Sequence, residues 1–262
     1  MGELIPFPGF EPARVDTWLI DLADGTRWEP FDLVDAGIHL ADCPPVRARH
    51  NFPGMLSKPG WYWSDVEPDD LVIFESLAER DALTVLHFEY DLAAVAWTPC
   101  RVWHQDTGKP EYHELDFVAL CTNGDTVVAD VRPADRVNDK FRRKSAWTKD
   151  MCDALDWTYR HFDDNQSQYV ANVKKLSLHA RPLEPQLADW YVAPVLDLCT
   201  ADSPAIDDVL IAVAKGVTDG DVLLVWHVIQ HLLWTRRLAT DLHGKVGGDS
   251  QLMLGPAALG GR

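Results

Sequence analysis

Residues 111–133 read EYHELDFVALCTNGDTVVADVRP, and the fold of the surrounding chain depends on this stretch. Residues 113–121 and 126–132 are two β-rich runs of mostly apolar residues. Between them, Asn123-Gly124-Asp125 is typical of a tight hairpin turn, because Asn and Gly accept the positive φ that such turns need. The stretch therefore predicts two antiparallel strands joined by a short turn.

Each predicted strand carries one carboxylate in an apolar setting. Asp116 precedes Phe-Val-Ala-Leu, and Asp130 follows Val-Val-Ala. A charge in such a run costs free energy unless a partner or a metal ion takes it up. Two carboxylates on adjacent strands also repel each other, and a divalent cation relieves that repulsion. Both aspartates are therefore candidate metal ligands, although each could instead be an ordinary turn or ion-paired residue.

The order of Asp116, a hairpin and then Asp130-Val131-Arg132 resembles the PD-(D/E)xK nuclease signature. Two positions depart from it, because Leu115 stands where the signature has proline and Arg132 where it has lysine. Arginine keeps the positive charge but stays protonated, so it is a poor proton acceptor. Two residues along a strand, Arg132 would share a face with Asp130, so the two could also form a simple ion pair.

The composition is that of a folded protein of one large domain or two modest ones. The chain has 262 residues, and its hydrophobic fraction of 47% argues against disorder. We expect neither a membrane span nor a secretory signal, because no apolar run is long enough and the N-terminus lacks a basic region before an apolar one. The five cysteines form no CxxC pair, which favours a reducing, cytoplasmic environment.

The formal net charge is −17, which on its own argues against nucleic acid as a ligand. Residues 132–181, however, carry a net +4, between a net −16 before them and −5 after them. Affinity for free DNA should then be modest and fall with salt, so help from a partner protein is expected. The cations of one predicted helix are candidate DNA ligands, or else an ordinary exposed face, and they are Lys140, Arg142, Arg143, Lys144 and Lys149.

Residues 1–50 are expected to form an irregular arm followed by a β-hairpin with Asp24-Gly25 at its turn. A loop rich in Pro and Gly follows, over residues 47–60. It either contacts DNA or is simply solvated, and its basic residues are Arg47, Arg49, His50 and Lys58.

Residues 51–183 are expected to form the domain that holds the site. Ser76 and Glu79 have the spacing of a capping box at the start of a helix over residues 77–88. Glu79 is then a cap, a metal ligand or both, and Glu75 could share its face of the helix.

The remaining elements of this domain are a strand over residues 93–105, the central hairpin, an amphipathic helix over 134–163 and a strand over 168–173. Together with the first helix they give the order αβββαβ. An α/β fold with this order and a mixed sheet is the minimal core of a restriction-endonuclease-like domain.

Residues 184–262 are expected to form a separate helical domain. Helices are predicted over residues 185–199, 205–216 and 221–237, followed by short strands over 238–242 and 251–254. Three helices and a Gly-rich hairpin suggest a winged-helix-like module. His227 and His231 are four residues apart, but Val228 stands where the HExxH motif has glutamate, so packing is favoured over a metal site.

The chain resembles the TnsA-like endonuclease subunits of heteromeric transposases. The similarity covers residues 51–183, about half of the chain, and the tail is similar to their helical, winged-helix-like part less specifically. The matching stretches are FESLAERD over residues 74–81, HFEYD over 87–91, Leu115-Asp116-Phe117, and VADVRP over 128–133.

The resemblance implies a Mg²⁺- or Mn²⁺-dependent DNA endonuclease that cuts the 5′ side of transposon ends by phosphodiester hydrolysis. It implies a site of Glu79, Asp116 and Asp130 with Arg132, in which the Val131 carbonyl also contacts the metal. The implied partners are transposon-end DNA, a DDE-type transposase and an AAA+ ATPase regulator, so the protein would gather on the nucleoid. Two alternatives stay open, a catalytically weak DNA-end-binding or transposase-bridging subunit and a restriction or defence nuclease.

Overall fold

The computed structural model describes residues 18–48, 57–63, 71–105, 111–163, 167–217 and 220–259. Its contacts divide the chain into two compact units. Unit 1 contains Met1–Leu83 and Tyr90–Asp164, and unit 2 contains Thr84–Glu89 and Asn165–Arg262. By this division, helix α2, Leu77–Glu89, contributes residues to both units. The boundaries expected after residues 50 and 183 stay predictions.

The first sheet of unit 1 is antiparallel, with the strand order β2-β1-β6-β7. The predicted N-terminal hairpin is confirmed, with Gly25 at φ +83 in its turn, although residues 30 and 31 already belong to helix α1. The elements are β1 (Trp18–Leu22), β2 (Arg27–Trp28), α1 (Pro30–Asp35), β6 (Cys100–His104) and β7 (Glu111–Glu114).

The second sheet is mixed, with the strand order β10-β9-β8-β5. Strands β5 (Leu92–Trp97), β8 (Phe117–Cys121) and β9 (Thr126–Val131) are antiparallel neighbours. Strand β10 (Thr158–Phe162) lies parallel to β9, and helix α3 (Asp139–Ala154) makes the crossover between them. The hairpin predicted at Asn123-Gly124-Asp125 is confirmed, and Gly124 has φ +92.

Two of the predicted strands are each divided between the two sheets. The strand expected over residues 93–105 breaks at Thr98, whose φ is 44, and at the following Pro99, so β5 and β6 are separate. The strand expected over 113–121 breaks between Glu114 and Phe117. Asp116 therefore lies at the point where the chain passes from the first sheet to the second.

The structure corrects the elements predicted over residues 134–163 and 168–173. The expected long helix ends at Ala154, because Asp156 adopts φ 58 and the chain turns into β10. The expected strand over 168–173 is instead part of helix α4, Gln168–Leu176, whose start Ser167 caps by accepting from Val170 N. The last strand of the sheet is thus ten residues earlier than expected. The mixed α/β class is confirmed.

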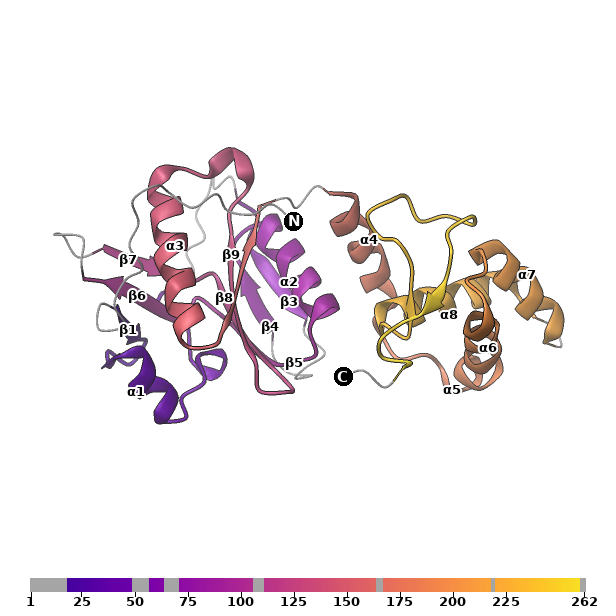
Figure 1. Ribbon diagram of the computed structural model, residues 1–262, viewed down its shortest axis with the longest axis horizontal. Coiled ribbons are helices and arrows are strands. Elements are labelled where there is room, and N and C mark those ends of the chain that lie inside the picture. The colour runs from indigo at the N-terminus through magenta and orange to yellow at the C-terminus, as the bar shows by residue number, and fades with distance from the viewer. Residues whose placement is uncertain are drawn as a thin grey trace. The chain divides into compact units, whose positions relative to one another are not determined.

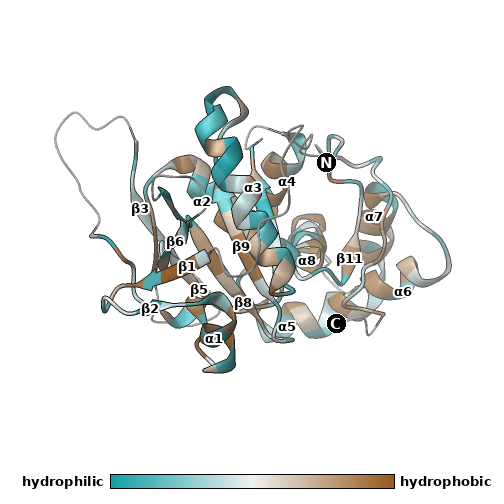
Figure 2. Ribbon diagram, turned by 60° about the vertical axis from the view of Figure 1, so that its left-hand side comes forward, coloured by the Kyte–Doolittle hydropathy of each residue, from teal (hydrophilic) through white to brown (hydrophobic). Residues whose placement is uncertain are grey.

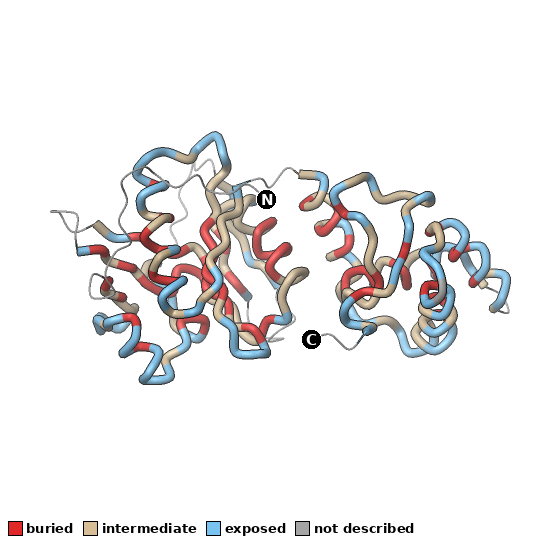
Figure 3. Tube along the Cα trace, viewed as in Figure 1, coloured by how far each residue is buried: buried red, intermediate tan, exposed pale blue. Residues whose placement is uncertain are grey.

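Buried residues concentrate in β8 and β9 (Figure 3). Val118 and Val128 pack with Trp147 and Met151 of α3. Val127 and Ala129 point to the opposite face and are equally buried, so this sheet is covered on both sides, with α2 on the side away from α3 (Figure 1). Near-continuous apolar strands are typical of such sheets, and β8 and β9 are brown in Figure 2.

The remaining elements of unit 1 are short. They are the 3₁₀ helices η2 (Leu40–Asp42) and η3 (Ala134–Arg136) and an antiparallel pair of strands, β3 (Gly60–Trp63) and β4 (Leu71–Phe74).

Unit 2 is helical, and its three predicted helices and its two short paired strands are confirmed, with small shifts of their ends. The core packs around Tyr191, Val195, Ile206, Ile229 and Leu232. The elements are α4, η4 (Ser177–His179), α5 (Pro185–Leu187), the π-helical η5 (Ala188–Val192), α6 (Ala193–Ala201), α7 (Ile206–Gly216), α8 (Val222–Trp234), β11 (Leu238–Ala239) and β12 (Met253–Leu254). Over the described ranges of the chain, no helix has both the length and the apolar character needed to cross a membrane.

Candidate carboxylate site

Asp116 and Asp130 lie next to each other where β8 and β9 end. The last paired residues of the ladder are Phe117 and Ala129, so the next position brings Asp116 opposite Asp130. The backbone N–H of Val131 donates to Asp116 Oδ2 at 2.7 Å. Burial raises the pKa of Asp116 well above its usual range, and the negative charges of Asp130 and Glu79 raise it further. The surroundings of Asp116 therefore disfavour its negative charge in the absence of a cation.

Asp130 is completely buried and is held by a hydroxyl relay from two other elements. Tyr159 on β10 donates its hydroxyl to Asp130 Oδ2 at 2.5 Å. Because Tyr159 already donates its hydroxyl proton to Asp130, the hydroxyl of Ser145 on α3 donates to the Tyr159 oxygen, 2.6 Å away. Burial, followed by the charge of Asp130, raises the pKa of Tyr159 well above its usual range, so the phenol stays a donor.

The second carboxylate oxygen of Asp130 is left open. Oδ1 lies 3.4 Å from His113 Nε2 but makes no hydrogen bond with any described residue. His113 Nδ1 is 2.9 Å from the Thr148 hydroxyl. Burial lowers the pKa of His113, which favours the neutral ring and leaves no full positive charge beside Oδ1. A buried acceptor with no donor is costly, unless something outside the described chain completes it.

Arg132, the residue that follows β9, also leaves a donor open. Its guanidinium carbon lies 5.6 Å from the centre of the Phe141 ring. Its buried Nε makes no hydrogen bond with another described residue, and no ion pair joins it to Asp130 within the part of the chain that the structure describes. The interpretation of Arg132 as a simple ion-pair partner of Asp130 is therefore wrong for this conformation.

Glu79 forms the predicted capping box. Its Oε2 accepts from Glu75 N at 2.7 Å and its Oε1 from the Ser76 hydroxyl at 2.9 Å, while Glu79 N donates to Ser76 Oγ at 3.2 Å. Burial raises the pKa of Glu79, and these two hydrogen bonds oppose that rise. Each oxygen of Glu79 thus accepts one hydrogen bond at the start of α2, and the negative charge of Glu79 acts on Asp116 through space.

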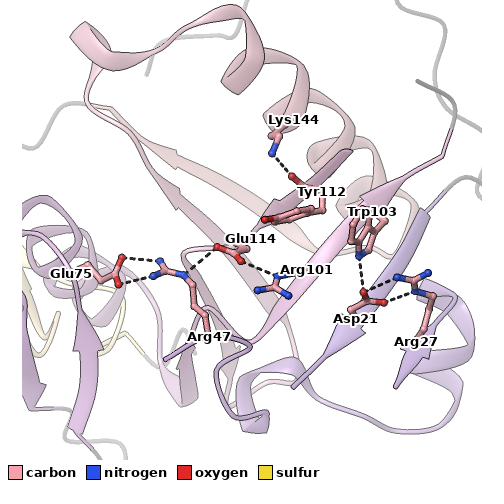
Figure 4. Close-up of polar contacts among 9 residues, drawn as sticks. All are labelled: Asp21, Arg27, Arg47, Glu75, Arg101, Trp103, Tyr112, Glu114 and Lys144. Carbon is pink, nitrogen blue, oxygen red and sulfur yellow. Dashed lines mark hydrogen bonds and ion pairs between the residues drawn. The ribbon is translucent and has the colours of Figure 1, made fainter. Parts of the chain in front are cut away.

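Arg47 ties the N-terminal loop to this site (Figure 4). Its Nη1 and Nη2 contact the two oxygens of Glu75 at 2.6 and 2.7 Å, and its Nε lies 3.1 Å from Glu114 Oε2. Its positive charge lowers the pKa of Asp116, against the larger raising effect of burial. Glu75, considered as a metal ligand from the sequence, instead pairs with Arg47. Arg49 and His50 lie outside the described residues.

Asp116 and Asp130 suit a divalent ion, whereas the role of Glu79 as a third ligand stays a prediction. Asp116 and Asp130 supply adjacent carboxylates that repel each other, and Asp130 Oδ1 is an unsatisfied buried acceptor. Glu79 is occupied by its cap. In the described ranges, no three side chains of His, Cys, Asp or Glu are arranged to hold one metal ion. The ligands that fit are therefore Asp116 and Asp130, with the neighbouring Val131 carbonyl as the expected third.

The five basic residues proposed for DNA occupy two sides of α3. Lys140, Arg143 and Lys144 share one side by their helical spacing, and Arg142 and Lys149 lie on another. Lys149 pairs with Asp153 at 2.5 Å. On the first side, Arg143 lies 3.7 Å from Glu111, and Lys144 donates to the Tyr112 carbonyl on β7.

Sequence reasoning did not find three residues that support the site, His113, Ser145 and Tyr159. The sequence predicts His113 in a strand and the other two in a helix, and it gives none of the three a role in the site. The only sequence signal is that each is a polar or aromatic residue within an otherwise apolar stretch. No protein-family model matches the chain, and a comparison with curated proteins finds no similar sequence.

Proposed function

We propose that unit 1 is a metal-dependent DNA endonuclease with a restriction-endonuclease-like core, and that the chain is the endonuclease subunit of a heteromeric transposase. The proposal follows from the resemblance of its motifs and from the order α2, β5, β8, β9, α3, β10, which matches αβββαβ. Unit 2 would be its winged-helix-like part, acting with a DDE-type transposase and an AAA+ ATPase at transposon ends.

One observation carries the proposal. Asp130 Oδ1 and Arg132 Nε are an open acceptor and an open donor of opposite charge, two residues apart in the sequence where β9 ends. An anionic phosphodiester with its bound cation would satisfy both groups at once, since the cation meets the carboxylate and the phosphate oxygen meets the guanidinium. Structural strands rarely leave two such groups unsatisfied side by side.

The residues have distinct roles in this proposal. Asp116, Asp130 and the Val131 carbonyl would hold Mg²⁺ or Mn²⁺, which supplies Lewis acidity and a water of lowered pKa. Tyr159 and Ser145 fix the rotamer of Asp130 through Oδ2 and keep Oδ1 available. Arg132 donates to the phosphate and stabilises the negative charge that develops on it, but it accepts no proton. Glu79 fixes the start of α2 beside them.

The test is Mn²⁺ binding by calorimetry in the presence of a short DNA duplex, because a phosphate often completes the ligand set. Wild type should bind, and Asp116→Asn and Asp130→Asn should each lose affinity by about 10- to 100-fold or more. Asp135→Asn, an exposed carboxylate on η3, is the matched control and should bind as wild type. Equal binding by all four proteins would contradict the assignment of the site.

A specific observation favours a second candidate, a DNA-end-binding subunit without cleavage. Asp130 is completely buried, and both oxygens of Glu79 already accept hydrogen bonds at the start of α2. For such an adaptor, Asp116→Asn and Asp130→Asn should leave assembly with the transposase and DNA ends unchanged, and wild type should show no metal-dependent strand cleavage with the partners present. Cleavage that both variants lose would reject it.

A further inference from the structure

One face of the first sheet carries two aromatic rings in contact, with cations around them. The pairing of β6 with β7 places Trp103 opposite Tyr112 and Arg101 opposite Glu114, so these four side chains share one face of the sheet. The Trp103 and Tyr112 rings are 4.9 Å apart. Arg27 lies 5.5 Å from the Trp103 ring, and Arg101 lies 5.4 Å from the Tyr112 ring. Tyr112 remains 39% exposed, so part of its ring is open to a ligand.

The two arginines on this face are neutralised by carboxylates. Asp21 accepts from Arg27 at 2.5 and 2.8 Å and from the Trp103 indole N–H at 2.7 Å (Figure 4). Glu114 accepts from Arg101 at 2.9 Å. These contacts orient the rings and leave little net charge on the sheet itself. A ligand that carries negative charge must therefore be attracted from elsewhere.

Helix α3 supplies that charge along the β7 side of the rings, although Glu111, 3.7 Å from Arg143, offsets part of it. Lys144 Nζ lies 5.3 Å from the Tyr112 ring, beside Arg143 and Lys140. Burial lowers the pKa of Lys144, and the positive charges of Lys140 and Arg143 add to this, although Glu111 and Glu114 oppose it. Lys140 is exposed and makes no ion pair with a described residue. Figure 2 shows this helix as largely hydrophilic.

We propose that Tyr112 and Trp103, together with Lys140, Arg143 and Lys144, bind a DNA strand with unpaired bases. Aromatic rings take the flat faces of unpaired bases, and adjacent cations hold the phosphates, whereas the bases of an intact duplex are stacked and unavailable. Strand β7 ends at Glu114, two residues before Asp116, so the chain leads from this surface to the carboxylate site. The inference rests on the proposed function for why DNA is bound here, and it adds that the DNA is opened.

The experiment measures binding of fluorescently labelled oligo-dT and of a blunt duplex of equal length by anisotropy, in EDTA. Because cleavage and metal binding are absent under these conditions, the result is independent of the carboxylate test. Wild type should prefer oligo-dT. Tyr112→Leu should weaken binding of oligo-dT by about tenfold and hardly affect the duplex, whereas Tyr112→Phe, which keeps the ring, should bind as wild type.

Two further variants complete the design. Lys140→Gln with Arg143→Gln should weaken binding of both DNAs and reduce the salt dependence, because these residues would contact phosphates. Trp190→Leu removes an exposed ring from unit 2 and should have no effect. Wild type that prefers the duplex, or folded Tyr112→Leu that binds oligo-dT as wild type does, would overturn the proposal. Loss of oligo-dT preference in Tyr112→Leu with intact Mn²⁺ binding would support it.

Discussion

Asn172 in unit 2 and Asp130 in unit 1 are both buried polar side chains, but their hydrogen bonding differs. In unit 2, Asn172 is 3% exposed and fully satisfied, because its Nδ2 donates to Leu242 O and Gly244 O, both at 2.8 Å, and its Oδ1 accepts from Gln168 at 3.0 Å. In unit 1, Asp130 is 0% exposed and leaves Oδ1 without a donor. Both side chains are equally inaccessible, so burial alone does not explain the difference.

The difference separates a structural group from one retained for another purpose. A satisfied buried amide fixes the loop that it contacts and stabilises the fold. An unsatisfied buried carboxylate lowers stability, and proteins keep such groups mainly where function requires them. Replacement of the two residues should therefore change stability in opposite directions.

The largest expected effect is in unit 2. Asn172→Ala removes two donors from the loop carbonyls of Leu242 and Gly244 and should lower the free energy of unfolding of unit 2 by about 2–3 kcal/mol. Gln168→Ala removes a single outer hydrogen bond and should cost about 1 kcal/mol or less. Hydrogen exchange of α4 and α8, followed by mass spectrometry, measures the change within this unit. Equal losses in the two variants would mean that the amide does not hold the loop.

A smaller change of opposite sign is expected in unit 1. Asp130→Asn keeps an acceptor for Tyr159 and removes a desolvated charge that faces Asp116. Without metal, it should raise the free energy of unfolding of unit 1 by about 1–2 kcal/mol. Urea unfolding monitored by exchange in β8 and β9 is the measurement, with Asp135→Asn as an unchanged control. If Asp130→Asn instead lowers the free energy of unfolding as much as Asn172→Ala does, the contrast between the two buried groups is wrong.

Glu79 is an intermediate case, since it is largely buried but satisfied by its own helix. Glu79→Ala and Ser76→Ala should each lower stability by about 1 kcal/mol, because each removes half of the capping box. Glu79→Gln keeps the cap and should leave both stability and Mn²⁺ affinity near those of wild type. A selective loss of Mn²⁺ affinity in Glu79→Gln would show that Glu79 leaves the cap and acts as a ligand.

Local signals in the sequence predicted part of this arrangement. The capping box at Ser76 and Glu79 and the turns at Gly25 and Gly124 depend on neighbouring residues, and all three are confirmed. Because Asn123-Gly124-Asp125 specifies a tight hairpin, the closeness of Asp116 and Asp130 also followed from local sequence.

The supporting residues depended on distant contacts and were missed. The end of α3 requires Asp156 in a left-handed conformation, and β10 is fixed by pairing with β9, from Thr158 opposite Val127 onward. The prediction puts the last strand at residues 168–173 and Tyr159 in the preceding helix, so it does not place Tyr159 beside Asp130. Val170, Val173 and Leu176 have a helical spacing that does indicate α4, and it was read as β-rich sequence.

The smallest expected effect is a pH dependence of unit 2. His179 Nδ1 lies 2.7 Å from His227 Nδ1, and His231 Nδ1 contacts the His179 carbonyl at 2.9 Å. Burial, and then the nearby His227 and His231, lower the pKa of His179. Because its folded pKa is lowered, the unfolded state binds the proton more readily. The stability of unit 2 should be complete above the ordinary histidine pKa of about 6.5 and fall as pH decreases toward the folded value.

Asp116 makes the contribution of opposite sign in unit 1. Its raised pKa means that the folded state binds a proton first, so acidification relieves the repulsion from Asp130, although the lowered pKa of His113 partly opposes this gain. After correction for the intrinsic exchange rate, which itself falls with pH, the protection of α8 should therefore decrease between pH 7.5 and 5.5 more than the protection of β9 does. His179→Gln should remove most of this pH-dependent loss of protection in α8. If the variant retains it, the histidine pair is not its source, and the contrast between the units lies in the carboxylates alone.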